Sequence, residues 1–443
     1  MEGDPGKTDS SLKKLASFSV LTMTVTLLRF GSRIIKNSVF TRLLGPAERG
    51  VFGLLTTIPD LIVCSGDLGL GMGTMYLAAK KKYDLGKLIG NTIMASVLLG
   101  AVMVAVGYVL LSYEGILKGD AATISALAPI VLFMVPFVLL QRFGEDLLLA
   151  VQEIKFLNTM KMVFSTFPIL ALIVLYLLTG KALQSAMYAW GSSVIIFGLG
   201  AVLRVSALCN YRLGLSFDYF KETLSYGIKI MGSTLAGVFV KRIDVLIVSS
   251  MLGAEPLGYY AISVSMAEII LAVPDAVNIP FLPIRLGLEK KEAKSVTPVV
   301  TRVLFFFMLL LCILSVLFSG LAVQILFGSK FLPAIPPLLW LLPGIVMWSI
   351  HEVLKSELYG HGHPGFVSFE AGMTLACNVG LNFMLIPVMG INGAALSSSI
   401  AYTLAAGILL WKFTSLSGVR LSEMLIIKKE DLQGIKRALF KKR

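Results

Sequence analysis

Long apolar runs alternate with short polar stretches along almost the whole chain. Most runs reach the roughly 20 residues that a helix needs to cross the hydrocarbon core of a membrane. The stretches between them are rich in Gly, Pro and Lys, which is typical of turns and loops. The pattern predicts about twelve spanning helices. They lie near residues 15–44, 51–79, 88–112, 122–150, 156–179, 182–209, 225–252, 258–285, 296–319, 334–358, 364–388 and 391–416.

The first two predicted helices recur in the middle of the chain. Residues 17–82 align with residues 225–290 without a gap, and each copy predicts two helices around a Leu-Gly turn. The aligned pairs include Met23 and Met231, Arg33 and Lys241, Gly45 and Gly253, Gly50 and Gly258, Asp60 and Glu268, and Asp67 and Asp275. A self-match at a fixed spacing indicates a repeated architecture.

The repeat extends to both halves of the chain. Pro129-x6-Pro136 returns as Pro336-x6-Pro343, and Gly180 returns as Gly390. Six helices are an even number, so both halves enter the membrane from the same side, an arrangement known in transporters. The sequence therefore predicts an all-α polytopic membrane protein, with two parallel six-helix repeats around a central cavity. Its predicted parts are a cytoplasmic tail (1–14), two bundles (15–209 and 225–416), a cytoplasmic linker (210–224) and a basic cytoplasmic tail (417–443).

The composition agrees with this architecture. Of the 443 residues, 56% are hydrophobic and 15% are charged, whereas an ordinary soluble domain has about 25% charged residues. The net charge of +13 comes from Lys and Arg in loops and tails. This distribution is the positive-inside pattern, not a signal for nucleic acid, and it predicts that both termini are cytoplasmic.

The sequence contains no pattern that predicts catalysis or a metal site. The four cysteines lie in apolar runs, and His361-Gly-His363 lies in a predicted loop without converging ligands. No spacing supports a Ser-His-Asp arrangement. We therefore expect a protein that is not an enzyme and that holds no cofactor and no metal.

Several predicted helices carry ionisable residues near mid-membrane. Such groups are costly in lipid, so they usually face a bundle interior or a cavity and are functional candidates. Arg33 and Asp60 both lie about 15 Å from the first Leu-Gly turn at 1.5 Å per residue. Lys241 and Glu268 repeat this geometry in the second half. We predict that each pair faces each other or shares one cavity.

These charges allow two interpretations. In one, ion pairs only hold each hairpin together. In the other, cationic helices line a central cleft and bind an anion, and Arg is suited to phosphate because its donors form a planar fork. The predicted substrate-binding residues are Arg29, Arg33, Lys36, Lys241 and Arg242. The predicted acidic groups of the cavity, which would take a coupling ion (Na⁺ or H⁺), are Asp60, Asp67, Asp244, Glu268 and Asp275.

Some charged residues also have a simpler interpretation. Asp67 lies in the Gly-rich stretch 66–73, where its carboxylate can instead cap a bend of the helix. Both second helices of the halves are expected to bend, because glycines or prolines interrupt them. Two groups near the ends of helices four and ten are expected to be solvated. They are Arg142, Glu145 and Asp146, and Glu352, Lys355 and Glu357.

The first Leu-Gly turn carries a pattern found in a known superfamily. It reads Arg42-x-Leu44-Gly45-x4-Gly50-x-Phe52, and Leu252-Gly253-x4-Gly258-Tyr259-Tyr260 echoes it. With the twelve-helix layout over residues 12–416, the chain resembles the oligosaccharide flippases of the multidrug/oligosaccharidyl-lipid/polysaccharide exporter superfamily. The motif is a family marker and carries no information on the substrate.

The resemblance implies a flippase in the cytoplasmic (inner) membrane of a prokaryote. Such a protein moves a polyprenyl-diphosphate-linked oligosaccharide from the cytoplasmic to the outer leaflet by alternating access. Its implied partners are the lipid-linked sugar, membrane lipids and other polysaccharide-assembly proteins. The basic C-terminal tail is suited to an anionic membrane surface.

Two other functions stay open at this point. A cation-coupled multidrug exporter of the same fold would favour acidic and aromatic cavity groups over Arg29 and Arg33. A membrane-embedded polysaccharide polymerase or ligase would need a sizeable outer loop with catalytic residues. The predicted outer loops are too short for that.

Overall fold

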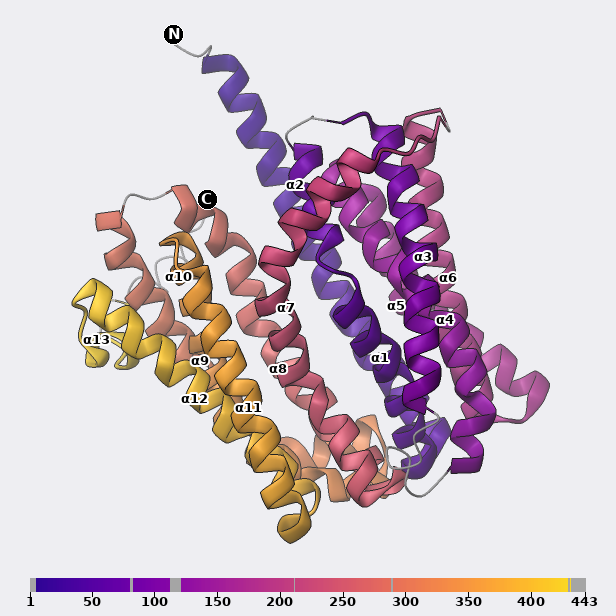
Figure 1. Ribbon diagram of the computed structural model, residues 1–443. Helices are drawn as coiled ribbons and strands as arrows, with labels where there is room; N and C mark the ends of the chain where they lie inside the picture. The colour runs from indigo at the N-terminus through magenta and orange to yellow at the C-terminus, as the bar shows by residue number, and fades with distance from the viewer. Residues whose placement is uncertain are drawn as a thin grey trace. The chain divides into compact units, whose positions relative to one another are not determined.

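The computed structural model describes residues 5–79, 83–111, 121–210, 212–287, 290–428 and 431. Within them, the side chains of residues 5–27, 79, 110–111, 121–122, 229–230, 233, 275–287 and 290–295 are not described. Every regular element in the described part is a helix (Figure 1), which confirms the all-α prediction. The chain divides into two compact units, Met1–Gly232 and Ser233–Arg443.

Each unit consists of a set of long helices. The first holds α1 (Pro5–Gly66), α2 (Leu70–Ala79), α3 (Leu85–Leu111), α4 (Ala121–Ala150), α5 (Ile154–Thr179), α6 (Ala182–Leu208) and the first turns of α7 (Phe217–Leu252). The second holds the rest of α7, α8 (Ala254–Gly287), α9 (Lys290–Leu326), the 3-10 helix η2 (Ser329–Ala334), α10 (Ile335–Gly360), α11 (Pro364–Met389), α12 (Ile391–Ser417) and α13 (Leu421–Leu425). In the described residues, nine helices are long and apolar enough to cross a membrane, or ten if the bent pair α1 and α2 counts as one span. The twelve helices predicted from the sequence exceed these ten because they also include α7 and because they count the two arms of α1, before and after Gly45, as separate spans.

The glycines of the two predicted Leu-Gly turns both have a positive φ. Gly45 breaks α1 with φ of 72°, and Gly253 separates α7 from α8 with φ of 86°. Only glycine adopts this left-handed region without a steric penalty. Pro46 follows Gly45 and suits the first turn of the new arm, where its missing N–H is not needed. The sequence repeat is therefore also a structural repeat at these turns.

A second break separates α1 from α2. The two helices are bent by 57°, which confirms the predicted bend of the second helix in the first half. A side chain at Gly227 of α7 would meet the Leu68 carbonyl oxygen at 2.5 Å, so the backbone at the break packs directly against α7. Because α7 begins at Phe217, the last part of the predicted linker 210–224 is helical and belongs to the first unit.

The second unit is packed around α10 and α12. Val240 of α7, Trp348 of α10, and Tyr402 and Ala405 of α12 form one buried apolar cluster. The rings of Trp348 and Tyr402 lie 4.6 Å apart at their centroids. The cluster fixes α7 against α10 and α12, and the polar groups described next lie on these same helices.

Candidate functional site

Three cations lie at helical spacing on the first arm of α1. Arg33 is exposed, while Arg29 and Lys36 are half-buried. The Nε atom of Arg29 is buried and makes no hydrogen bond within the described residues. The Nζ atom of Lys36 lies 5.7 Å from the ring centroid of Phe164 on α5. This arm of α1 therefore presents a positive face in the first unit.

The predicted ion pairs have different outcomes in the two units. Arg33 and Asp60 are both exposed on α1, and their pairing stays a prediction. In the second unit, Arg242 Nη2 lies 2.9 Å from Glu268 Oε1. Glu268 thus pairs with Arg242, the residue after the Lys241 that the sequence predicts to face it. The Lys241 ammonium lies 5.0 Å from the ring centroid of Trp348. Asp275 falls among the residues whose side chains are not described.

Asp67 holds the break between α1 and α2. Its Oδ1 accepts a hydrogen bond from the Gly69 N–H at 3.0 Å, and its Oδ2 lies 2.9 Å from Nε of Arg142 on α4. The carboxylate therefore caps the bend and is also ion-paired. Arg142 is not the freely solvated helix end that we expected, because the break brings this carboxylate against α4. Glu145, next to it on α4, pairs with Lys161 of α5.

Asp244 is the most enclosed carboxylate among the predicted site residues that the structure describes. It lies on α7 and is 3% exposed. Its Oδ2 accepts a hydrogen bond from the Tyr260 hydroxyl of α8, and the Ser398 hydroxyl of α12 lies 3.5 Å from the same oxygen. Its Oδ1 accepts the Val245 N–H at 2.8 Å. Three helices of the second unit thus meet at this carboxylate.

Two asparagines of α11 extend this group. Asn378 Nδ2 donates to Ser398 Oγ at 3.3 Å, and Asn382 Nδ2 donates to Asn378 Oδ1 at 3.0 Å. Both asparagines are fully buried. The Oδ1 atom of Asn382 has no hydrogen-bond partner within the described residues. Buried carbonyl oxygens are nearly always satisfied, so this atom is an available ligand for a cation.

Sequence analysis did not identify these hydroxyl and amide groups. The available signal was polar spacing: Asn378 and Asn382 are four residues apart in an apolar run, so they share one helix face. We call Asp244, Tyr260, Asn378, Asn382 and Ser398 the oxygen cluster. In the described part of the chain, no three His, Cys, Asp or Glu side chains converge as metal ligands. The oxygen cluster instead combines one carboxylate with neutral oxygens.

A polar pocket of about 510 Å³ lies between α7, α10 and α11 in the second unit. Lys241 and Arg242 line it, together with Glu352 and Lys355, which we expected to be solvated. Lys355 Nζ lies 2.6 Å from Glu352 Oε2. Two further lining residues also interact: His351 Nε2 lies 3.2 Å from Glu370 Oε2. Both Glu370 and His351 are nearly fully buried.

The expectation of a solvated end for α10 is wrong. Glu357 is fully buried and accepts a hydrogen bond from the Thr297 hydroxyl of α9 at 2.9 Å. His361 Nδ1 lies 3.1 Å from Glu357 Oε1. The sequence places Glu357 near the end of α10 but does not indicate that α9 covers this position.

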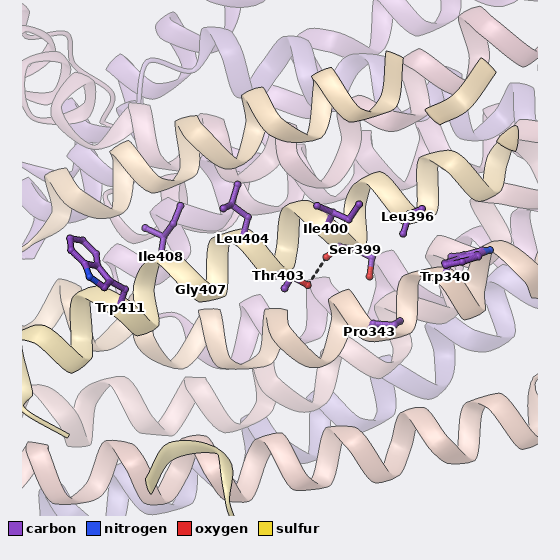
Figure 2. Close-up of a pocket in the computed structure, with 10 residues that line it drawn as sticks. All are labelled: Trp340, Pro343, Leu396, Ser399, Ile400, Thr403, Leu404, Gly407, Ile408 and Trp411. Carbon is purple, nitrogen blue, oxygen red and sulfur yellow. Dashed lines mark hydrogen bonds between the residues drawn. The ribbon is translucent and has the colours of Figure 1, made fainter. Parts of the chain in front are cut away.

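A second cavity, of about 730 Å³, lies on α10 and α12 and has a different chemistry. Figure 2 shows its lining, which runs along α12 from Leu396 to Trp411. The lining is apolar except for the Ser399 and Thr403 hydroxyls and the indole N–H groups of Trp340 and Trp411. The Thr403 hydroxyl donates a hydrogen bond to the Ser399 carbonyl oxygen. With no ionisable side chain, this cavity suits hydrocarbon better than a charged headgroup.

These features define the class of the molecule. Apolar helices in two units, with ionisable groups held inside the spans, are typical of a polytopic membrane protein built as transporters are. Solved structures share the fold. The chain superposes on an inward-closed structure of the lipid II flippase MurJ with a TM-score of 0.77, at 12% identity over 96% of this chain and 93% of that one.

A second solved structure has the same fold. It is an inward-facing multidrug resistance transporter of the MATE family, with a TM-score of 0.73 at 14% identity over 90% of this chain and 98% of that one. At these identities the likeness concerns the fold alone.

Residues 39–336 match the protein family described as polysaccharide biosynthesis proteins, and the chain belongs to that family. A curated relative from Haloferax volcanii is named "Probable low-salt glycan biosynthesis flippase Agl15". It is 23% identical over 399 residues, which cover 88% of this chain and 81% of the relative. The resemblance inferred from the Leu-Gly turn is thereby confirmed at the level of family and fold.

Proposed function

We propose that this protein flips a polyprenyl-diphosphate-linked oligosaccharide from the cytoplasmic to the outer leaflet by alternating access. Family membership and the relative named as a glycan biosynthesis flippase support the flippase class. The observation that carries the anionic substrate is the positive face of α1, where the Arg29 Nε is buried without a hydrogen-bond partner in the described residues. A buried guanidinium donor left unpaired is costly, and a diphosphate oxygen satisfies it.

The substrate-binding residues in this proposal are Arg29, Arg33 and Lys36 in the first unit and Lys241 and Arg242 in the second. Arginine binds phosphate oxygens through two parallel N–H donors. Lysine contributes a point charge on a flexible stem. The proposed direction of transfer rests on the predicted orientation, with both termini in the cytoplasm.

Coupling to an ion is the second part of the proposal. The oxygen cluster around Asp244 is our candidate site, because oxygen ligands are what hard cations bind. The free Oδ1 of Asn382 supports a cation at this place. Asp67 is a weaker candidate, because its charge is already paired with the Arg142 guanidinium at 2.9 Å, whereas the recorded partners of Asp244 are neutral hydroxyl and backbone N–H groups.

The test is leaflet transfer in liposomes. Wild-type protein is compared with Arg29→Ala, Arg33→Ala and the control Lys181→Ala, which removes an exposed cation at the start of α6. Each lost hydrogen bond to a charged group is worth about 1.5–3 kcal/mol. We therefore expect transfer to fall about tenfold or more in the two Arg variants and to stay unchanged in the control.

The alternative function has its own readout in the same liposomes. Wild-type protein that exports organic cations but moves no lipid-linked sugar would replace the proposal with the cation-coupled exporter. Glu352 and Glu370 of the polar pocket are the carboxylates that such an exporter would use for an organic cation. Transfer measured with a sodium gradient, a proton gradient and neither gradient identifies the coupling ion.

A further inference from the structure

The polar pocket between α7, α10 and α11 has a charge pattern of its own. Seven ionisable side chains line it: Lys241, Arg242, His351, Glu352, Lys355, Tyr359 and Glu370. Three of them are cations, two are carboxylates, one is an imidazole and one is a phenol. At about 510 Å³, the pocket is in the size range of small-molecule sites.

Both carboxylates of the pocket already have partners. Glu352 binds the Lys355 ammonium at 2.6 Å. Glu370 is engaged by His351 Nε2 at 3.2 Å and by the Thr374 hydroxyl at 2.8 Å. An incoming cation would have to displace these groups. The carboxylates are therefore poorly placed to hold a cationic ligand.

Lys241 is in the opposite situation. Its ammonium lies 5.0 Å from the ring centroid of Trp348, and no carboxylate of the described residues forms an ion pair with it. A ring face stabilises an ammonium by only about 0.5–2 kcal/mol. Glu352 acts on Lys241 only from beyond ion-pair distance, so an oxyanion beside Lys241 would add a direct ion pair that this ammonium lacks. Lys355 is already paired with Glu352, but its ammonium has three N–H donors and can share the same oxyanion.

His351 adds a second, different recognition group. Its Nδ1 is buried and has no hydrogen-bond partner in the described residues, and the nearest recorded carboxylate oxygen, of Glu352, is 3.9 Å away. When Nε2 donates to Glu370, the neutral ring leaves Nδ1 as an acceptor. An acceptor at this place binds a hydroxyl group, such as one on a sugar ring.

We propose that this pocket binds an anionic sugar unit, with its oxyanion between Lys241 and Lys355 and a ring hydroxyl on His351 Nδ1. The inference rests on the proposed function and narrows it, because it assigns a headgroup subsite to the second unit alone. The oxyanion is either the phosphate that joins the first sugar to the lipid or the carboxylate of an acidic sugar within the oligosaccharide. Both have the same chemistry in the pocket.

The experiment is calorimetric binding to the purified full-length protein in detergent. The probes are glucose 1-phosphate, glucuronate, inorganic phosphate and glucose. We expect one or both anionic sugars to bind more tightly than inorganic phosphate and glucose. Preference for glucose 1-phosphate identifies the lipid-linkage phosphate as the source, and preference for glucuronate identifies an acidic sugar.

Matched variants separate the pocket from a general charge effect. Lys241→Gln and Lys355→Gln should each weaken binding of the preferred sugar about tenfold, as expected for loss of a charged hydrogen bond. The control is Lys412→Gln, because Lys412 also lies 5.0 Å from an aromatic ring centroid, that of Phe366, but does not line the pocket. The control should bind like wild type.

One further variant should change binding in the opposite direction. Glu352→Gln removes a negative charge and frees Lys355, so we expect it to bind the anionic sugar several-fold more tightly. A misfolded protein cannot produce this gain. His351→Phe should remove the preference for glucose 1-phosphate or glucuronate over the simple anion.

Several results would overturn the inference. They are equal weakening in Lys412→Gln, weaker binding in Glu352→Gln, or no binding of either anionic sugar up to its solubility limit. The proposed function is judged separately, by lipid transfer in liposomes. Anionic sugars that bind through Lys241 and Lys355 in a protein that transfers no lipid would support the pocket and refute the flippase.

Discussion

Replacing Asp244 by Asn tests whether the oxygen cluster is a cation site. The variant keeps the shape of the side chain and removes its charge. In the structure, Asp244 Oδ2 accepts hydrogen bonds from the hydroxyl groups of Tyr260 and Ser398. The Oδ1 atom of Asn382 has no hydrogen-bond partner in the described residues. We expect wild-type protein to be stabilised by the coupling cation, and Asp244→Asn to lose that stabilisation.

The size of the effect follows from the unsatisfied oxygen. A buried carbonyl without a partner costs about 1–3 kcal/mol, and a cation that binds Asn382 Oδ1 recovers this cost. Independently, an ion at about 100 times its dissociation constant stabilises the folded state by about 2.7 kcal/mol. The two considerations agree on about 1–3 kcal/mol of sodium-dependent stability.

The assay is the unfolding midpoint of detergent-purified protein in sodium chloride and in choline chloride at equal ionic strength. Wild type should unfold at a higher temperature in sodium, and Asp244→Asn should unfold at the same temperature in both salts. Asp218→Asn, at an exposed carboxylate of the first unit outside the predicted ion-binding residues, is the control and should keep the difference. An identical sodium shift in wild type and Asp244→Asn would refute the assignment of the cluster. If pH shifts the wild type and sodium does not, the coupling ion is the proton.

Two further predictions concern stability. Gly344→Ala places a methyl group 2.5 Å from the Ser399 Cα and should cost about 1–3 kcal/mol through overpacking. Gly372→Ala, inside α11, meets no atom within 4 Å and should unfold at or slightly above the wild-type temperature, because alanine favours a helix by about 0.5–1 kcal/mol over glycine. The Arg302 guanidinium holds the pKa of Asp431 below its usual range through two hydrogen bonds of 2.5 Å. This contact therefore stabilises the folded state above the ordinary carboxyl pKa and is lost only as pH falls through the lowered value. Asp431→Asn should expose the C-terminal segment to protease at pH 7, and equal cleavage of wild type and variant at that pH would contradict the docking.

The fold was predictable because its helices break at residues whose chemistry favours a turn. Gly45 and Gly253 occur at matching places in the repeat, and both require the left-handed backbone that glycine allows. The start of α7 at Phe217 was not predictable, because residues 210–224 are polar enough for a loop. Close backbone packing of Gly214 against Gly90 and of Thr223 against Gly73 holds this stretch in the first unit.

The candidate site was predictable only in part. Charged residues inside apolar runs stand out, so Asp244, Lys241 and Arg242 were identified from sequence. Their partners did not stand out. Serine and asparagine occur throughout membrane helices, and only the tertiary fold brings Ser398 and Asn378 to Asp244.

The two copies of the repeat carry opposite charges at one aligned position, Lys36 in the first unit and Asp244 in the second. The gapless alignment places Lys36 on Asp244 and Phe52 on Tyr260. In the second unit the Tyr260 hydroxyl stabilises the buried carboxylate, whereas Phe52 in the first unit has no hydroxyl to donate. Lys36 instead lies near the Phe164 ring, and a ring face attracts a cation and not a carboxylate. The same helix position thus carries a cation on the positive face of α1 in the first unit and an anion in the oxygen cluster, the candidate cation site of the second unit. The Phe164 ring does not stabilise a carboxylate, so exchanging Lys36 and Asp244 would leave the carboxylate at position 36 without a suitable partner.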